Sequence, residues 1–178
     1  MKFPKTILII DDEREVRSRI REALTRTAER FFEASNGREG LEFLGKNKIH
    51  AVIVDDQMPV MDGLSFMKQV RAKRVEVPCI MVTNSKAQDP MLKTNAVLWG
   101  VFQLVEKTDH FENLTHVTEK VIELSERISN VDAELDRLCE KNEIPLEKRA
   151  AYIKEQRPQL ILQLTMEAMS SKSHRQTG

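Results

Sequence analysis

Six polar residues stand at the ends of short apolar runs and could act together chemically. They are Asp11, Asp12, Asp55, Asp56, Thr83 and Lys107. Several carboxylates at one site cannot all stay ionised without compensation, and a divalent cation is the natural compensation. Oxygen ligands with room for water suit Mg²⁺. A carboxylate beside Mg²⁺, with a lysine and a threonine facing it, predicts phosphoryl transfer onto that carboxylate.

The elements that must position these residues alternate along the first part of the chain. Short apolar runs predict strands buried on both faces at 7–10, 31–34, 51–54, 79–82 and 101–105. Amphipathic stretches of helical length lie between these runs. The β-α repeat predicts an α/β fold with a doubly wound, five-stranded parallel sheet. In such a sheet the ligand site lies at the carboxyl ends of the strands.

Four segments resemble the receiver domain of two-component response regulators. They are I-L-I-I-D-D-E at 7–13, V-D-D-Q-M-P-V-M-D-G at 54–63, V-T at 82–83 and the lysine at 107. The D-x-x-M-P-x-M-D-G part is the most specific, and the order and spacing of all four make the match strong. The resemblance covers about the first 124 residues and implies a flavodoxin-like receiver fold.

The resemblance also implies a role for each matching residue. Asp55 would be the phosphorylated aspartate, and Thr83 and Lys107 would be the catalytic residues that contact the phosphoryl oxygens. The Mg²⁺ ligands would be Asp11, Asp12, Asp55 and the backbone carbonyl of Gln57. A histidine kinase or a phosphotransfer protein would be the phosphodonor.

The sequence departs from the family pattern at three positions. Asn84 follows the switch threonine, where the family usually has a very small residue, and Leu104 replaces the usual aromatic. Thr108 replaces the proline that usually follows the lysine across a cis bond. A cis bond without proline costs about 2.5–4 kcal/mol, so either the bond is trans or the site tolerates strain. The output face is therefore expected to be specific to this protein.

Other polar residues favour structural roles. The side chain of Asp56 should point away from that of Asp55, which predicts a surface or capping role. Asp62 is expected to shape its loop and Cys79 to be a small core residue. The histidines show no metal-ligand spacing; they are His50, His110, His116 and His174.

The C-terminal part of the chain carries a heptad seam, in which apolar residues recur at alternating steps of three and four. The seam residues are Leu114, Val117, Val121, Leu124, Ile128, Val131, Leu135 and Leu138. Such a seam must be buried. A second chain could cover it and form a homodimer, or the rest of the tail could fold back as a hairpin. Both arrangements can hold together in a four-helix dimer.

These patterns predict a receiver domain at 1–124 and an α-helical coiled-coil or bundle extension at 125–178. The last receiver helix is expected to continue to about residue 141. Pro145 and Pro158 each suit a helix start, which predicts helices at about 145–156 and 158–170.

The charge balance bears on the class of partner. The chain of 178 residues has 28 basic and 28 acidic residues. Residues 1–109 hold 18 basic and 16 acidic residues, and the remainder holds 10 and 12, so the two parts carry +2 and −2. This balance argues against a strongly basic nucleic-acid binder. Two cysteines and the lack of an apolar run of about 20 residues predict a soluble, cytoplasmic protein without a membrane span.

The sequence therefore predicts a phosphorylation-controlled response regulator with no separate catalytic domain, read out through a dimerising tail by a downstream protein. One alternative is an RNA-binding helical output, which the lack of a basic stripe in the tail disfavours. Another is a phosphorelay intermediate that uses His116, at an exposed heptad position. No kinase or phosphotransfer motif flanks that histidine.

Overall fold

The computed structural model describes residues 4–84, 90–107 and 111–170. Within these residues it contains five strands and seven helices. The strands are β1 (Thr6–Ile10), β2 (Arg30–Ala34), β3 (Ala51–Asp55), β4 (Cys79–Thr83) and β5 (Val101–Glu106). The helices are α1 (Arg14–Ala23), α2 (Gly37–Lys46), α3 (Gly63–Ala72), α4 (Pro90–Leu98), α5 (Glu112–Ser129), α6 (Val131–Lys141) and α7 (Leu146–Ser170).

The chain forms two compact units, residues 1–122 and 123–178. The boundary falls two residues before the one expected from the sequence, and α5 begins in the first unit and ends in the second. None of the helices in the described part of the chain is long and apolar enough to cross a membrane.

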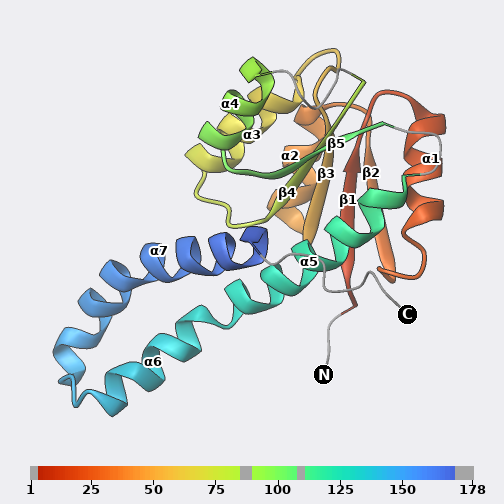
Figure 1. The fold of residues 1–178 in the computed structure, drawn as a ribbon. Helices are drawn as coiled ribbons and strands as arrows, with labels where there is room; N and C mark the ends of the chain where they lie inside the picture. The colour runs from red at the N-terminus through yellow and green to blue at the C-terminus, as the bar shows by residue number, and fades with distance from the viewer. Residues whose placement is uncertain (1–3, 85–89, 108–110, 171–178) are drawn as a thin grey trace. The chain divides into compact units, whose positions relative to one another are not determined.

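The five strands form one parallel sheet in the order β2-β1-β3-β4-β5. Within the first unit, α1 and the start of α5 cover one face of the sheet, and α2, α3 and α4 cover the other (Figure 1). This strand order is the flavodoxin-like arrangement, in which the order reverses between the first and third strands. The predicted fold class is confirmed.

The strands are buried on both faces because helices cover both. On one face Leu8, Val52 and Met81 form a core with Phe66 and Met67 of α3. The intervening strand residues point to the other face and are fully buried as well; they include Ile7, Ile9, Ile53 and Ile80. Continuous apolar runs are what such doubly covered strands require.

Two helix starts are fixed by side-chain caps. The Asn36 side chain accepts hydrogen bonds from the backbone N–H groups of Arg38 and Glu39 at the start of α2. Asp62 accepts one from the N–H of Ser65 at 2.7 Å and begins α3. Such caps contribute about 1 kcal/mol each. The expected loop-shaping role of Asp62 is thus a cap on the helix that follows the acidic segment.

All five strands are one residue longer than the predicted apolar runs, and in β3 and β4 the added residue belongs to the predicted site. β3 continues to Asp55, which lies opposite Val82, and β4 continues to Thr83, which lies opposite Glu106. The backbone hydrogen bonds between strands do not require an apolar side chain at the last position. A strand can therefore continue beyond the apolar residues that predict it. Asp55 and Thr83 are therefore held by strand pairing rather than by a loop.

The C-terminal helices differ from the prediction in two places. α5 ends at Ser129 and α6 starts at Val131, where one continuous helix was expected. The backbone N–H of Asn130, between them, bonds the carbonyl of Arg127 three residues back, which tightens the turn and breaks the regular ladder. α7 runs through Pro158, where a new helix was expected to start. A proline removes a single N–H from the ladder, and the turns on either side continue.

In the second unit α6 and α7 pack against each other as a hairpin (Figure 1). Three ion pairs show that the hairpin is antiparallel: Arg127–Glu167 at 2.9 Å, Asp132–Arg157 at 2.7 Å and Glu140–Arg149 at 3.8 Å. Exposed pairs of this kind contribute little stability. The hairpin depends mainly on its apolar residues, and Val131, Leu135, Cys139 and Leu164 are buried.

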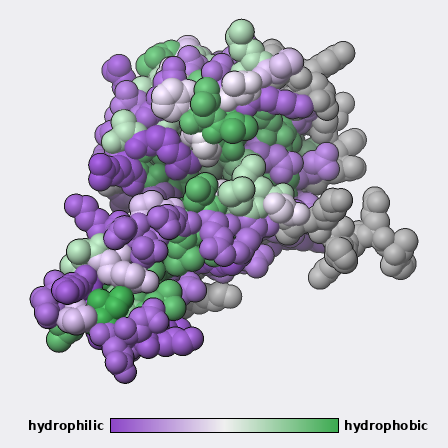
Figure 2. Space-filling model, turned by 60° about the vertical axis from the view of Figure 1, so that its left-hand side comes forward, coloured by the Kyte–Doolittle hydropathy of each residue, from purple (hydrophilic) through white to green (hydrophobic). Residues whose placement is uncertain are grey.

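Most of the heptad seam is buried within this single chain. The buried members are Leu114, Val117, Val121, Leu124, Ile128, Val131 and Leu135, and Leu138 is half-buried. In α6 the seam packs into the chain's own hairpin, as one of the two predicted arrangements requires. Pairing with a second chain stays a prediction. Elsewhere, hydrophobic side chains interrupt a mainly hydrophilic surface (Figure 2).

Substitution of Gly63 can show how closely α3 approaches the end of β3. A Cβ at this position would overlap the backbone carbonyl oxygen of Asp55. We expect Gly63→Ala to lower the free energy of unfolding by about 1–3 kcal/mol, because a backbone atom cannot move aside as a flexible side chain can. Urea denaturation followed by circular dichroism measures this change.

Gly45→Ala is the matched control. Gly45 lies in α2 and a Cβ there would meet no atom within 4 Å. Alanine is the better helix former, so this variant should gain about 0.5–1 kcal/mol. Equal effects of the two substitutions would contradict the close approach at Gly63.

Candidate functional site

The first and third strands lie side by side, and three aspartates stand at their carboxyl ends. Asp11 and Asp12 follow β1, and Asp55 is the last residue of β3. One carboxylate oxygen of each lies within 4.8 Å of the other two. Asp11 and Asp55 are buried, whereas Asp12 is exposed. The predicted cluster therefore forms at the switch point of the sheet, with one member in contact with solvent.

Lys107 is held beside this cluster by the edge of the sheet. Its backbone N–H donates to the carbonyl of Thr83 at 2.9 Å. Its Nζ lies 2.8 Å from Oδ2 of Asp11 and 2.9 Å from Oδ2 of Asp55. The lysine side chain is only 6% exposed. A buried ammonium needs such partners, because an unpaired charge away from water is very costly.

The carboxylates decide the charge state of this lysine. Burial by itself disfavours the ammonium form and lowers the pKa of Lys107. Contacts with the carboxylates of Asp11 and Asp55 outweigh that effect, and the pKa ends above its ordinary value. Lys107 therefore carries a permanent positive charge between the two buried aspartates.

The Asp11 carboxylate is also oriented by the backbone. Its Oδ1 accepts a hydrogen bond from the N–H of Glu13 at 3.0 Å. Arg17 donates from Nη1 to the backbone carbonyl of Asp11 at 2.8 Å and fixes the turn after β1. These contacts leave Oδ2 of Asp11 directed at Lys107.

The Asp55 carboxyl group has a raised pKa and an oxygen atom without a hydrogen-bond partner among the described residues. Burial, opposed by Lys107 and reinforced by the negative charge of Asp11, raises the pKa of Asp55 to about 7. Its Oδ1 is buried and accepts no hydrogen bond from any residue in the described part of the chain. A buried carboxylate oxygen without a partner, beside two further carboxylates, is what a Mg²⁺ ligand set offers. The residues present thus fit this cation.

Thr83 and Asp56 form a contact that sequence reasoning missed. The Thr83 hydroxyl donates from Oγ1 to Oδ2 of Asp56 at 2.9 Å. The prediction of a surface or capping role for Asp56 was wrong, because strand alternation no longer applies to a residue past the end of β3. The register that sets Asp55 opposite Val82 brings Asp56 next to Thr83. Knowledge of the alignment of β3 with β4 would have been needed to predict this contact.

The other residues named in the sequence analysis lie outside the cluster of Asp11, Asp12, Asp55 and Lys107 or outside the described residues. Gln57 is exposed in the segment between β3 and α3, Asn84 is exposed after β4, and Leu104 is half-buried in β5. Cys79 is a buried free cysteine inside β4, as expected. The Lys107–Thr108 bond, His110 and His174 fall outside the described residues. Of the other histidines, His50 accepts a hydrogen bond from the N–H of Thr6, and His116 is exposed on α5.

A flavodoxin-like sheet that carries an acidic cluster and a buried lysine at its switch point defines a phosphoacceptor signalling domain. The chain belongs to the response regulator family, because the sequence pattern described as "Response regulator receiver domain" matches residues 7–119. Domains of this family accept phosphoryl groups from histidine kinases and bind Mg²⁺ at an acidic pocket. The predicted family is confirmed.

Two curated relatives show the extent of the likeness. Response regulator MprA of Mycolicibacterium vanbaalenii is 34% identical over 81 residues, which is 46% of this chain and 35% of that protein. Sensor histidine kinase CheAY of Helicobacter pylori is 35% identical over 122 residues, 66% of this chain and 15% of that protein. This chain thus spans about a third or less of these relatives, and the likeness concerns the receiver domain.

A solved structure supports the same assignment. The response regulator TrrA from Thermotoga maritima, in complex with Mg²⁺ and BeF, is 27% identical with a TM-score of 0.58. The match covers 66% of this chain and 98% of that one.

The pKa of Asp55 predicts how stability changes with pH. The folded protein keeps the Asp55 proton up to about pH 7, whereas the ordinary value is 3.8. Between these values the folded state binds more protons than the unfolded state, so the free energy of unfolding falls as the pH rises. Asp55→Asn cannot ionise at this position, so the variant does not lose stability in this way as the pH rises. In Mg²⁺-free buffer its stability relative to wild type should increase from pH 5 to pH 8, by up to about 3 kcal/mol.

Urea denaturation at several pH values measures this difference. At pH 8, added Mg²⁺ should stabilise the wild type and leave Asp55→Asn almost unchanged, which serves as the control. A difference between the two proteins that is independent of pH would contradict the assignment of a raised pKa to Asp55.

Proposed function

We propose that the protein is a phosphorylation-controlled response regulator in which Asp55 is the phosphoacceptor. The observation that carries this proposal is the environment of the Asp55 carboxylate. Its Oδ2 is 2.9 Å from Lys107, while its Oδ1 is buried and accepts no hydrogen bond from the residues that the structure describes. Lys107 thus neutralises part of the charge of the carboxylate that would accept the phosphoryl group.

In the transfer step, an oxygen of Asp55 attacks the phosphorus and forms a new P–O bond. The bond from phosphorus to the donor atom breaks, and its electron pair leaves with the donor. The Lys107 ammonium neutralises charge on the transferred group, and the Thr83 hydroxyl can donate a hydrogen bond to a phosphoryl oxygen. The product is an acyl phosphate on Asp55.

Asp11, Asp12 and Asp55 would hold the Mg²⁺ ion, together with the backbone carbonyl of Gln57. The clustered carboxylate oxygens of the three aspartates support this assignment. When bound, the ion supplies positive charge that offsets the aspartates and the phosphoryl oxygens. The aspartates remain responsible for its position, since Asp11 is fixed by Lys107 and by the N–H of Glu13.

A histidine kinase or a phosphotransfer protein would supply the phosphoryl group. The relative CheAY, named a sensor histidine kinase, supports this class of donor. Aspartyl phosphate on Asp55 would shift the receiver between two states, and the C-terminal helices would convey that shift to a downstream protein.

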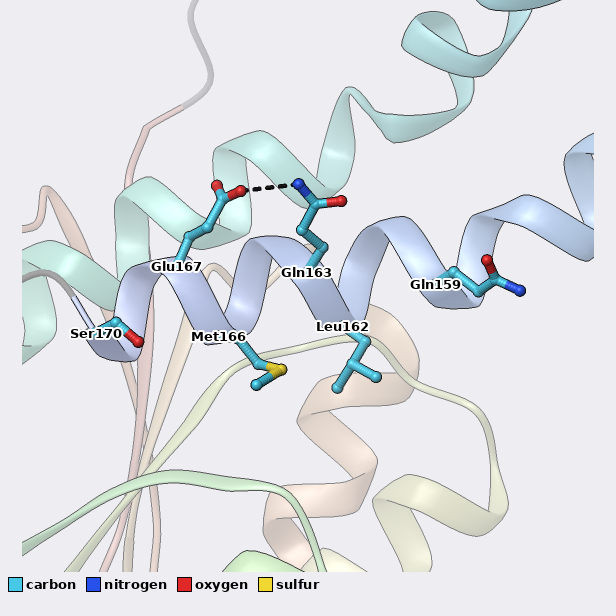
Figure 3. A pocket seen from close by; sticks show the side chains of 6 residues that line it. All are labelled: Gln159, Leu162, Gln163, Met166, Glu167 and Ser170. Atoms are coloured by element: carbon cyan, nitrogen blue, oxygen red, sulfur yellow. Dashed lines mark hydrogen bonds between the residues drawn. The ribbon is translucent and has the colours of Figure 1, made fainter.

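The tail would also join two copies of the chain, through the outer face of α7. Leu162, Met166 and Met169 lie at spacings of four and three residues and are 61%, 60% and 52% exposed. Figure 3 shows Leu162 and Met166 on one side of α7, with Gln163 and Glu167 on the opposite side. A shallow hollow follows this part of the helix.

The charges of α7 favour a second copy as the occupant of this face. From residue 156 to 170 the only charged residues are Arg157 and Glu167. Arg157 is paired with Asp132 and Glu167 with Arg127 inside the hairpin. The exposed stripe is therefore neutral and apolar, and it needs a partner that is equally free of charge. The same stripe on another copy meets this requirement, and a two-fold axis would place one against the other.

Chemical labelling tests the phosphoacceptor. With Mg²⁺ and acetyl phosphate, we expect intact-mass spectrometry to detect one added phosphoryl group on wild type and none on Asp55→Asn. Asp62→Asn is the matched control, because it changes an exposed acid of the same segment and asparagine still caps α3. Absence of label on wild type, or equal labelling of Asp55→Asn, would refute the proposal.

Light scattering coupled to size exclusion tests the dimer. Full-length wild type should have twice the mass of one chain, and the double variant Leu162→Glu, Met166→Glu should be monomeric with unchanged helical content, because four charges would face each other in the dimer. Leu146→Glu is the control, since Leu146 is 78% exposed at the other end of α7 and should leave the dimer intact. A dimer that survives the double variant would indicate pairing through the heptad seam, and a monomeric wild type would refute dimerisation.

A further inference from the structure

The Thr83 hydroxyl is committed to a partner outside the three-aspartate cluster. It donates from Oγ1 to Oδ2 of Asp56 at 2.9 Å, and Thr83 is fully buried. A threonine hydroxyl has one proton and can donate one hydrogen bond at a time. While Asp56 holds that proton, the hydroxyl cannot donate it to a phosphoryl oxygen on Asp55.

We infer that Asp56 is a positioning residue that withholds the Thr83 hydroxyl from the phosphoryl group and thereby slows phosphorylation of Asp55. The inference rests on the proposed function, since it assumes that Asp55 accepts the phosphoryl group. Asp56 acts through Thr83. Its effect should therefore depend on the presence of the Thr83 hydroxyl.

The backbone keeps the two residues in place. The N–H of Asp56 donates to the carbonyl of Val82 at 3.1 Å, and the N–H of Lys107 donates to the carbonyl of Thr83 at 2.9 Å. Both main chains are thus tied into the sheet beside the acceptor. A change of partner by the Thr83 hydroxyl requires side-chain rotation and leaves these backbone bonds intact.

The type of acceptor makes the contact costly to break. A hydrogen bond to a carboxylate is about twice as strong as one between neutral groups. The incoming phosphoryl group must replace this bond before Thr83 can stabilise it. Loss of the Asp56 carboxylate should remove that barrier and accelerate phosphorylation by roughly tenfold, the size typical of a hydrogen bond to a charged group.

A second effect of Asp56 must be separated from the first. Its negative charge also repels an incoming anionic donor and its side chain interacts directly with Asp55, so removal of Asp56 would accelerate labelling even without any role for Thr83. The hydroxyl distinguishes the two effects. Electrostatic repulsion persists when Thr83 is replaced, whereas withholding of the hydroxyl does not.

The experiment is a double-mutant cycle on the full chain. Initial rates of labelling by Mg²⁺ and acetyl phosphate are measured by intact-mass spectrometry for wild type, Asp56→Ala, Thr83→Ala and the double variant. Asp56→Asn keeps an acceptor oxygen without the charge. Asp62→Asn removes an exposed charge from the same segment without contact to Thr83. Circular dichroism melting confirms that each variant is folded.

We expect Asp56→Ala to label about ten times faster than wild type and Asp56→Asn to lie between the two. Asp62→Asn should label at the wild-type rate. In the Thr83→Ala background, Asp56→Ala should produce no acceleration. Equal acceleration in both backgrounds, equal rates for Asp56→Ala and Asp56→Asn, or no acceleration at all would overturn the inference and leave the phosphoacceptor role intact. Failure of wild type and every variant to label would overturn both.

Discussion

A buried ammonium between two buried carboxylates is the interaction on which the functional edge of this receiver depends. Lys107 comes from the end of β5, Asp11 follows β1 and Asp55 ends β3, so three separate strands meet through one positive charge. None of these charged groups would be tolerated alone at that depth. The ion pairs explain why an acidic cluster can exist inside a tightly packed sheet, and they orient both carboxylates toward the shared ammonium.

The same cluster remains short of positive charge, and its chemistry follows from this deficit. One lysine faces Asp11 and Asp55, and Asp12 adds a third carboxylate nearby. Burial, together with the negative charge of Asp11, raises the pKa of Asp55, and its Oδ1 accepts no hydrogen bond from the residues that the structure describes. Under the proposed function, a divalent cation would correct the excess of negative charge, and a phosphoryl group would then have both a nucleophile and neutralising partners. The Thr83–Asp56 contact adds a restraint, because the hydroxyl expected to assist is already engaged.

The C-terminal part shows how a helical pattern can be satisfied in more than one way. A heptad seam requires an apolar partner surface and does not specify whether that surface belongs to another chain. For the α6 part of the seam, α7 supplies that surface, and Val131 and Leu135 are buried in the hairpin. Leu162, Met166 and Met169 of α7 are more than half exposed. Because the hairpin buries the α6 part of the seam, a second chain would have to pair with Leu162, Met166 and Met169 instead.

The sequence by itself determined the sheet, its doubly covered strands and the cluster of Asp11, Asp12, Asp55 and Lys107. Apolar runs are local properties that indicate the strands of a parallel sheet. The residues that follow those runs then meet at one edge of that sheet. Only the tertiary structure decided what depends on register and packing. The Thr83–Asp56 hydrogen bond follows from the alignment of β3 with β4. That alignment is a long-range contact, which leaves no periodic trace in a single chain. The break at Asn130 and the passage of α7 through Pro158 were visible only in the structure, because apolar spacing and proline positions are compatible with either a break or a continuous helix.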